Sequence, residues 1–312
     1  MSVIKRIANP ITVAFALVIV LFLIGGIATP VFVSPVNLQN IFVMASFIGL
    51  VGFGQTLCIL IGGIDLSIPG TVAIGGLITA YYAGNDPSSL PLIVTLVLLG
   101  CLVVGLINGL VVALFQVPPI LMTLGMNGAL VGLGLTLTNG GTTPGSPQAL
   151  RDFVGGSLLG LSNLLWIWII VAVIATILLS FTTFGRRIYA TGTNSRATYL
   201  AGINVRLTTV GPYVISALCG GLAGILLLGF YGLAFSSMGD TYLFSSAVAV
   251  AIGGASLLGG RGHYLGTIAG ALILTLIPAL LALLSIGPAA NSIVYGVILL
   301  FAVFLARGRK AT

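Results

Sequence analysis

Long apolar runs separated by short polar gaps dominate this chain and constrain its fold more than any other feature. Only 5% of its 312 residues are charged, 58% are hydrophobic, and Glu is absent. A soluble globular chain carries about 25% charged residues. Because so few charges cannot build a water-facing surface for a chain of this length, we expect most of its surface to face lipid.

Ten of these runs are predicted to be transmembrane helices. They cover residues 11–29, 38–61, 69–83, 90–115, 119–138, 164–184, 209–229, 245–258, 264–285 and 288–306. A helix needs about 20 apolar residues to span a bilayer. Two runs are shorter, 69–83 and 245–258, so we expect helices that are tilted, shielded by neighbours or paired with loops that dip into the protein. The sequence predicts an all-α, polytopic membrane protein of about ten helices, in a single transmembrane domain over residues 1–312.

The basic residues predict the orientation of these helices. If the N-terminus is cytoplasmic, only one of the eleven Lys and Arg residues, Arg151, faces outward. The inner side receives Lys5, Arg6, Arg186, Arg187, Arg196, Arg206, Arg261, Arg307, Arg309 and Lys310. Such a bias marks cytoplasmic loops, so we expect both termini in the cytoplasm and a multi-pass membrane protein in contact with lipid. Because the charges sit in the gaps between runs and form no single patch, no nucleic-acid partner is expected.

No pattern in the chain predicts catalysis, a cofactor or a metal site. There is one His, the three Cys lie inside apolar runs without metal-ligand spacing, and the phosphate-binding P-loop pattern is missing. We therefore expect no catalytic residue, no metal ligand and no cofactor. If the chain takes part in active transport, the energy must enter through another subunit.

Asp65 is the most informative single residue, because it lies between two apolar runs. A carboxylate deep in a bilayer costs about 2.5–3.5 kcal/mol on insertion scales. One interpretation is a helix start, with Ser67 as N-cap and Pro69 just inside the helix. The other is a site on a transport path or at an inner gate, formed with Gly63 and Ser67. The residues alone leave both open.

Two glycine pairs of the chain lie in similar local sequences. Gly62-Gly63 and Gly253-Gly254 each follow an Ile, and each is followed later by Gly-Thr. Either a duplicated helix–loop–helix element or chance explains the match, because the chain has 44 Gly. We include Gly253 and Gly254 among the candidate residues of the path or inner gate.

Residues 185–208 are predicted to form a long inner loop that carries a short helix. Asn194 or Ser195 can cap such a helix, and Gly202 can end it. Its apolar positions are Ala197, Leu200, Ala201 and Ile203. A short amphipathic helix of this kind either lies in the lipid interface or inserts into a groove of a partner protein.

Four segments, in this order, resemble the membrane-spanning permease subunit of bacterial ribose-type sugar importers of the ATP-binding cassette (ABC) class. They are 62–67, 117–126, 184–190 with matching positions up to 203, and 252–262 with Gly266 and Thr267. Together they extend over residues 35–275, about three quarters of the chain. Four ordered matches are more specific than any one of them.

The resemblance implies a pore that passes a monosaccharide across the inner membrane, driven by ATP hydrolysis on a separate subunit. It also implies a ten-span fold akin to the vitamin B12 importer (type II). The implied partners are cytoplasmic ATP-binding ABC subunits, a periplasmic sugar-binding protein, and a second permease, either an identical copy or a sister chain. The implied residues of contact with the ATPase are Gly192, Asn194, Ala197, Leu200, Gly202 and Ile203.

One departure from the family leaves the solute and the permease pairing open. The family often has an acidic residue after a Tyr shortly before the second Ile-Gly-Gly, whereas here Leu243 follows Tyr242 and Asp240 is displaced. Alternatives are an ABC permease for branched-chain amino acids or another small solute, and a secondary transporter or channel working alone. The scarcity of intramembrane ionisable groups counts against proton coupling.

Overall fold

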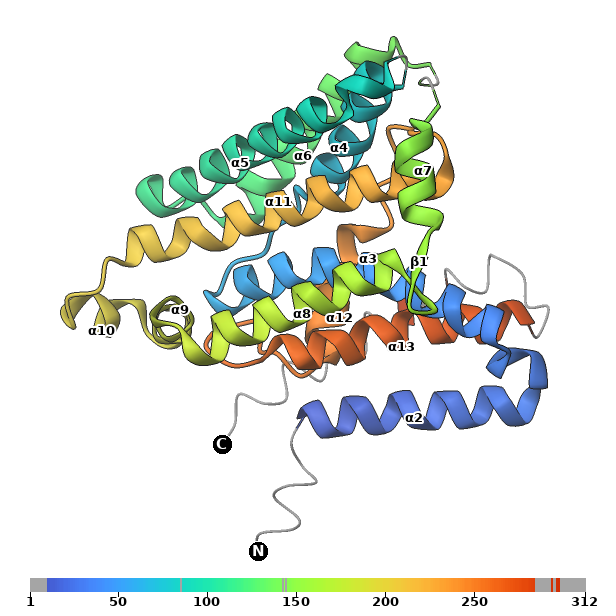
Figure 1. Cartoon of the computed structure of the whole chain (residues 1–312). Coiled ribbons are helices and arrows are strands. Elements are labelled where there is room, and N and C mark those ends of the chain that lie inside the picture. The colour runs from blue at the N-terminus through green and yellow to red at the C-terminus, as the bar shows by residue number, and fades with distance from the viewer. Residues whose placement is uncertain are drawn as a thin grey trace, which may run out of the picture.

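The computed structural model describes residues 10–84, 86–141, 143 and 145–283, with 293, 296 and 297. These residues are mainly helical (Figure 1). The long helices are α2 (Pro10–Ala28), α3 (Pro35–Leu60), α5 (Leu90–Phe115), α6 (Pro119–Thr138), α8 (Asn163–Phe181), α11 (Val205–Tyr231) and α13 (Tyr264–Leu283). The shorter ones are α4 (Ile68–Ala83), α7 (Gln148–Gly155), α9 (Thr183–Thr193), α10 (Ser195–Leu200), α12 (Tyr242–Ile252), and the 3-10 turns η1 (Pro30–Val33) and η2 (Pro87–Ser89).

The long helices lie side by side, with α9 and α10 at one end of the bundle and α7 at the other (Figure 1). We call these the α9 end and the α7 end. Beside α7, strands β1 (Ser157–Leu158) and β2 (Leu161–Ser162) form a small antiparallel hairpin in which Ser157 pairs with Ser162. Among the described residues, seven helices are long and apolar enough to cross a membrane, and α4 and α12 are shorter apolar helices.

Nine of the ten predicted runs are therefore helices, which confirms an all-α polytopic membrane protein. The runs 90–115 and 119–138 match α5 and α6 at both ends. The run 245–258 is wrong in its second half, because α12 ends at Ile252. Positive φ angles, which a helix does not allow, follow at Gly254, Gly259 and Gly260. The run 288–306, the end of 264–285, and Lys5, Arg6, Arg307, Arg309 and Lys310 lie outside the described residues.

Three helices form the centre of the bundle. Helix α3 is almost wholly buried, and α4 and α11 are largely so. Most residues of α2, α5, α6 and α8 are exposed or half-buried, and these helices present apolar side chains outward. Lipid gives helices little hydrophobic reason to associate, so close packing depends on small residues. Gly75 and Gly224 show this between α4 and α11, since a Cβ on Gly224 would overlap the carbonyl oxygen of Val72, and one on Gly75 would lie 2.5 Å from that of Gly221.

Local sequence sets where the helices begin. Proline occupies the first turn of α3, α4, α5 and α6, where its missing N–H costs nothing. The Asn204 side chain accepts a hydrogen bond from the backbone N–H of Leu207 and so caps α11. Between α6 and α8, helix α7 forms after Pro147.

Candidate functional site

The connection between α3 and α4 turns back into the helix bundle. After Leu60 the chain leaves the helix, Gly62 adopts a φ of +83°, and the backbone N–H of Asp65 donates to Oε1 of Gln55 at 3.3 Å. Gln55 lies five residues before the end of α3, about 7 Å along the helix axis. Asp65 is therefore inside the bundle, near the α9 end. Non-helical backbone at membrane depth is tolerated where it is buried and its polar groups are satisfied.

Side chains of α6 satisfy the backbone at the end of this connection. The N–H of Leu66 donates to Thr123 Oγ1 at 2.9 Å, and the N–H of Gly70 donates to Asn127 Oδ1 at 2.7 Å. Asn127 thus accepts from the free N–H group in the first turn of α4. Helix α6 holds both the extended segment and the start of α4.

Ser67 occupies the N-cap position of α4, but its side chain bonds to Asp65 and does not cap the helix. Ser67 directly precedes α4 and Pro69 lies in its first turn, which confirms the helix start. The Ser67 side chain makes no capping bond; its N–H and Oγ both donate to Asp65 Oδ1, at 2.8 and 2.6 Å. Ser67 Oγ also accepts from Nδ2 of Asn108, on α5, at 2.9 Å.

Asp65 and four other fully buried side chains form what we call the Asp65 cluster. Its members are Gln55, Asp65, Asn108, Tyr213 and Ser216, from α3, the α3–α4 connection, α5 and α11. Each has one polar atom without a hydrogen-bond partner: Gln55 Nε2, Asp65 Oδ2, Asn108 Oδ1, Tyr213 OH and Ser216 Oγ. Buried polar groups are normally hydrogen-bonded, and unpaired ones are expected where water, a ligand or a proton belongs.

The predicted path or gate residues fall into two places. Gly63 belongs with the Asp65 cluster, because a Cβ there would overlap the hydroxyl of Tyr213. Gly253 faces the backbone of Gly266 at the start of α13, and Gly254 faces Pro10 at the start of α2. The nearest neighbours of this second pair belong to helix-packing contacts.

Three segments meet at the α9 end in what we call the glycine junction. It consists of Leu60, Gly62, Gly192, Gly259 and Gly260. The N–H of Gly260 donates to the carbonyl oxygen of Leu60 at 2.9 Å. A Cβ on Gly192 would overlap that same oxygen, and one on Gly259 would lie 2.9 Å from the N of Gly62. The end of α9 is thereby in direct contact with the last residue of α3 and with the α12–α13 connection.

The segment 185–208 is mostly helical, because α9 and α10 occupy much of it. The short helix predicted there is confirmed as α10, with Asn194 as its cap, since Asn194 Oδ1 accepts from the N–H of Ala197 at 3.0 Å. Gly202 follows with a φ of +80°. Tyr199 and Leu200 are 70% and 77% exposed. Of the other predicted contact residues, Asn194, Ala197 and Gly202 are exposed, Ile203 is half-buried, and Gly192 lies in the glycine junction.

Sequence reasoning missed the amides and hydroxyls around Asp65 and at the start of α4. These are Gln55, Asn108, Asn127, Tyr213 and Ser216. A usable signal existed, because polar side chains inside an apolar run mark functional positions in membrane proteins. In the part of the chain that the structure describes, no group of His, Cys, Asp and Glu could hold a metal ion.

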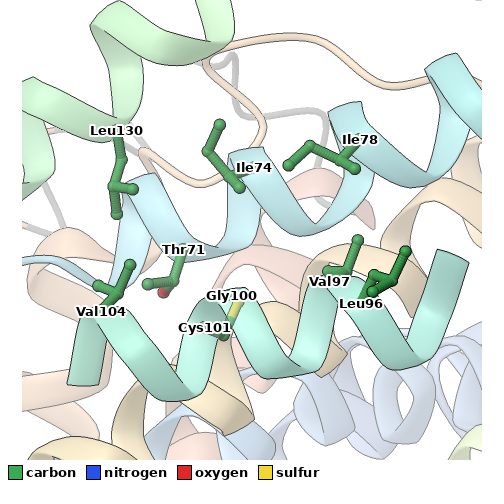
Figure 2. A pocket seen from close by; sticks show the side chains of 9 residues that line it. All are labelled: Thr71, Ile74, Ile78, Leu96, Val97, Gly100, Cys101, Val104 and Leu130. Atoms are coloured by element: carbon green, nitrogen blue, oxygen red, sulfur yellow. The ribbon is translucent and has the colours of Figure 1, made fainter. Parts of the chain in front are cut away.

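A cavity of about 190 Å³ lies between α4, α5 and α6 (Figure 2). It is lined by Thr71, Ile74, Ile78, Leu96, Val97, Gly100, Cys101, Val104 and Leu130. Its one hydroxyl, on Thr71, already donates to the carbonyl oxygen of Ile68 at 2.9 Å. Polar sites need convergent hydrogen-bonding groups, so this cavity does not suit a hydroxyl-rich solute, whereas the Asp65 cluster offers such groups.

Comparison with known proteins gives a consistent result over nearly the whole chain. Residues 37–303 match the family model described as branched-chain amino acid transport system / permease component. The D-allose transport system permease protein of Escherichia coli (strain K12) is 32% identical, covering 94% of this chain and 90% of its own length. The ribose import permease protein of Bacillus subtilis (strain 168) is 34% identical, covering 94% and 91%.

A further relative carries a different solute in its name. The autoinducer 2 import system permease protein of Shigella flexneri is 32% identical, covering 95% of this chain and 86% of its own length. No solved structure matches this chain.

Proposed function

This chain belongs to the family of branched-chain amino acid transport system permease components, and we propose that it is the permease subunit of a bacterial ABC importer for a monosaccharide. It is a multi-pass integral membrane protein. The observation that carries the proposal is its identity of 32–34% with permeases named for allose and ribose, over 94% of the chain. A branched-chain amino acid or another small solute is the alternative, and the family description and the autoinducer 2 relative favour keeping it.

The α9 end is the cytoplasmic end in this proposal. Exposed arginines support the assignment, because five of the six described ones lie at the α9 end and only Arg151 lies at the α7 end. The five are Arg186, Arg187, Arg196, Arg206 and Arg261. The proposal keeps both chain termini in the cytoplasm because the charges of the sequence predict it. A periplasmic sugar-binding protein delivers the solute to the α7 end.

ATP-binding ABC subunits dock on α10 and its surroundings, with residues 185–208 as the coupling segment. The exposed apolar side chains of Tyr199 and Leu200 support this, since an unpaired apolar patch outside the membrane marks a partner surface. Asn194, Ala197, Gly202 and Ile203 shape the patch, and ATP hydrolysis takes place on the partner. This chain is the translocation subunit and not itself an enzyme.

A second permease, identical or a sister chain, completes the pore. Helix α6 supports this part of the proposal, because Gly125, Gly128 and Gly132 have nothing within 4 Å of an added Cβ. Open small residues on one helix face allow another helix to approach closely. The ten-span arrangement of the vitamin B12 importer type is the fold we propose for the assembled subunit.

The glycine junction relays motion from the coupling segment to the gate. A shift of α9 displaces Gly192 against the carbonyl of Leu60, and the α3–α4 connection that follows carries Gly63, Asp65 and Ser67. A second contact from α9, the 2.7 Å bond from Tyr189 OH to the carbonyl of Gly262, moves the α12–α13 connection with Gly253 and Gly254. Both connections then open or close the inner end of the path together.

Ligand identification on the partner binding protein tests the solute. Titration with D-ribose, D-allose and L-leucine should give saturable binding of a sugar and none of the amino acid. Binding of leucine alone would move the assignment to the amino-acid alternative.

A further inference from the structure

The Asp65 carboxyl group is buried and has no basic partner among the residues that the structure describes. Its exposed fraction is 0%, whereas each of the six described arginines is exposed to solvent. The single histidine, His263, bonds instead to Ser180 Oγ at 3.0 Å and to the N–H of Leu265 at 3.1 Å. A buried carboxylate without a cation is strongly disfavoured, and such groups neutralise by taking up a proton.

The two oxygens of this carboxyl group differ in their surroundings. Oδ1 accepts from the N–H and the hydroxyl of Ser67, at 2.8 and 2.6 Å. Oδ2 has no hydrogen-bond partner, and neither has Oγ of Ser216, which lies beside the Asp65 carboxyl group on α11. A proton on Oδ2 donated to Ser216 Oγ would satisfy both atoms at once.

No other titratable group near the cluster can supply the missing charge. Cys58 faces Asp65 from α3 and Tyr213 faces it from α11, and both are neutral acids with no positive form. Asn108, on α5, bonds to Ser67, which in turn bonds to Asp65. Thr123, on α6, bonds to the backbone N–H of the neighbouring Leu66. Both side chains are uncharged. A proton is therefore the one compensating charge that these residues allow.

We propose that Asp65 is a proton-binding site, held as a neutral carboxylic acid whose Oδ2–H donates to Ser216 Oγ and latches the α3–α4 connection to α11. This latch rests on the proposed function where it concerns the gate. When the connection moves and cytoplasmic water reaches Asp65, the Oδ2–H bond breaks, water takes the proton, and the hydrated carboxylate keeps the segment open. Closure takes a proton back from the same side, so no net proton crosses the membrane.

The carboxyl inventory of the chain makes this site accessible to infrared spectroscopy. The chain has four Asp and no Glu, and Asp86, Asp152 and Asp240 are exposed. Permease with ¹³C-labelled Asp, in nanodiscs at neutral pH, should therefore show one protonated side-chain carboxyl band. Asp65→Asn should remove the band, and Asp86→Asn is the matched control that should leave it.

Ser216→Ala keeps the carboxyl group and removes its acceptor, so the band should remain and move to higher frequency. A wild-type spectrum with only ionised carboxylates would overturn the proposal, as would a protonated band that persists in Asp65→Asn or one unmoved by Ser216→Ala. Because the spectrum is measured on the permease alone, its outcome is independent of whether the solute is a sugar or whether transport needs ATP.

Discussion

The backbone N–H of Gly260 donates a 2.9 Å hydrogen bond to the carbonyl oxygen of Leu60. The bond joins the α12–α13 connection to the last residue of α3, directly before the segment that leads to Asp65. Gly192, at the end of α9, rests on the same carbonyl group. In the proposed relay, a displacement of α9 moves both connections, because the three segments share one contact.

Gly192→Ala should disrupt this contact. The added Cβ would overlap the Leu60 carbonyl and lie 2.6 Å from the N of Gly260, and neither backbone atom can rotate away. We expect destabilisation of about 1–3 kcal/mol, the usual range for overpacking, and a loss of solute uptake. Thermal unfolding and uptake in cells measure the two effects. Gly155→Ala, where nothing lies within 4 Å, is the control, and a Gly192 variant as stable and active as that control contradicts the relay.

Leu200→Asp should prevent association with the ATP-binding subunit. The side chain is 77% exposed, so the change leaves the fold intact while placing a charge in the proposed apolar contact. Pull-down of the ATPase with the purified permease measures it. Leu159→Asp, 86% exposed beside α7 at the other end, should bind the ATPase as the wild type does. Equal binding by both variants counts against docking at α10.

Most of the fold could be predicted because its signals are local. Apolar runs of bilayer length and proline at the helix starts give α5 and α6 their ends directly. The path of the α3–α4 connection could not be predicted in the same way, because it depends on hydrogen-bond acceptors far along the chain. Asn127, for example, accepts from Gly70 and lies 57 residues from it. Asp65 and Ser67 can be recognised in the sequence as polar residues between apolar runs. Asn108 lies within an apolar run, and its contact with Ser67 depends on how the helices pack.

Asn127→Ala should weaken the start of α4. Loss of the acceptor leaves the N–H of Gly70 buried and unpaired, which costs about 1–3 kcal/mol. Thermal unfolding in detergent should show a lower midpoint than for Thr136→Ala, whose hydroxyl bonds only within the exposed face of α6. Equal midpoints for the two variants would mean that Asn127 does not hold the connection.

His263 should titrate below the ordinary histidine value. Partial burial lowers the pKa of His263, and its Nδ1 accepts from the N–H of Leu265, which a protonated ring cannot do. In the unfolded chain this histidine binds a proton below about pH 6.5, whereas in the folded chain it does so only at a lower pH. The stabilisation is therefore complete above about pH 6.5 and is lost as the pH falls from there through the folded pKa. Because the chain has one His, NMR of ¹⁵N-histidine reports it alone. A midpoint at or above about 6.5 contradicts this assignment.

Reconstituted transport tests the central claim most directly. Proteoliposomes would contain this chain with its ATP-binding subunit and any sister permease, plus the binding protein and radiolabelled D-ribose or D-allose. We predict uptake that requires ATP and stops when the ATP-binding subunit carries an inactivating substitution. Uptake that proceeds without ATP, or through this chain alone, would contradict the assignment as an ABC permease subunit.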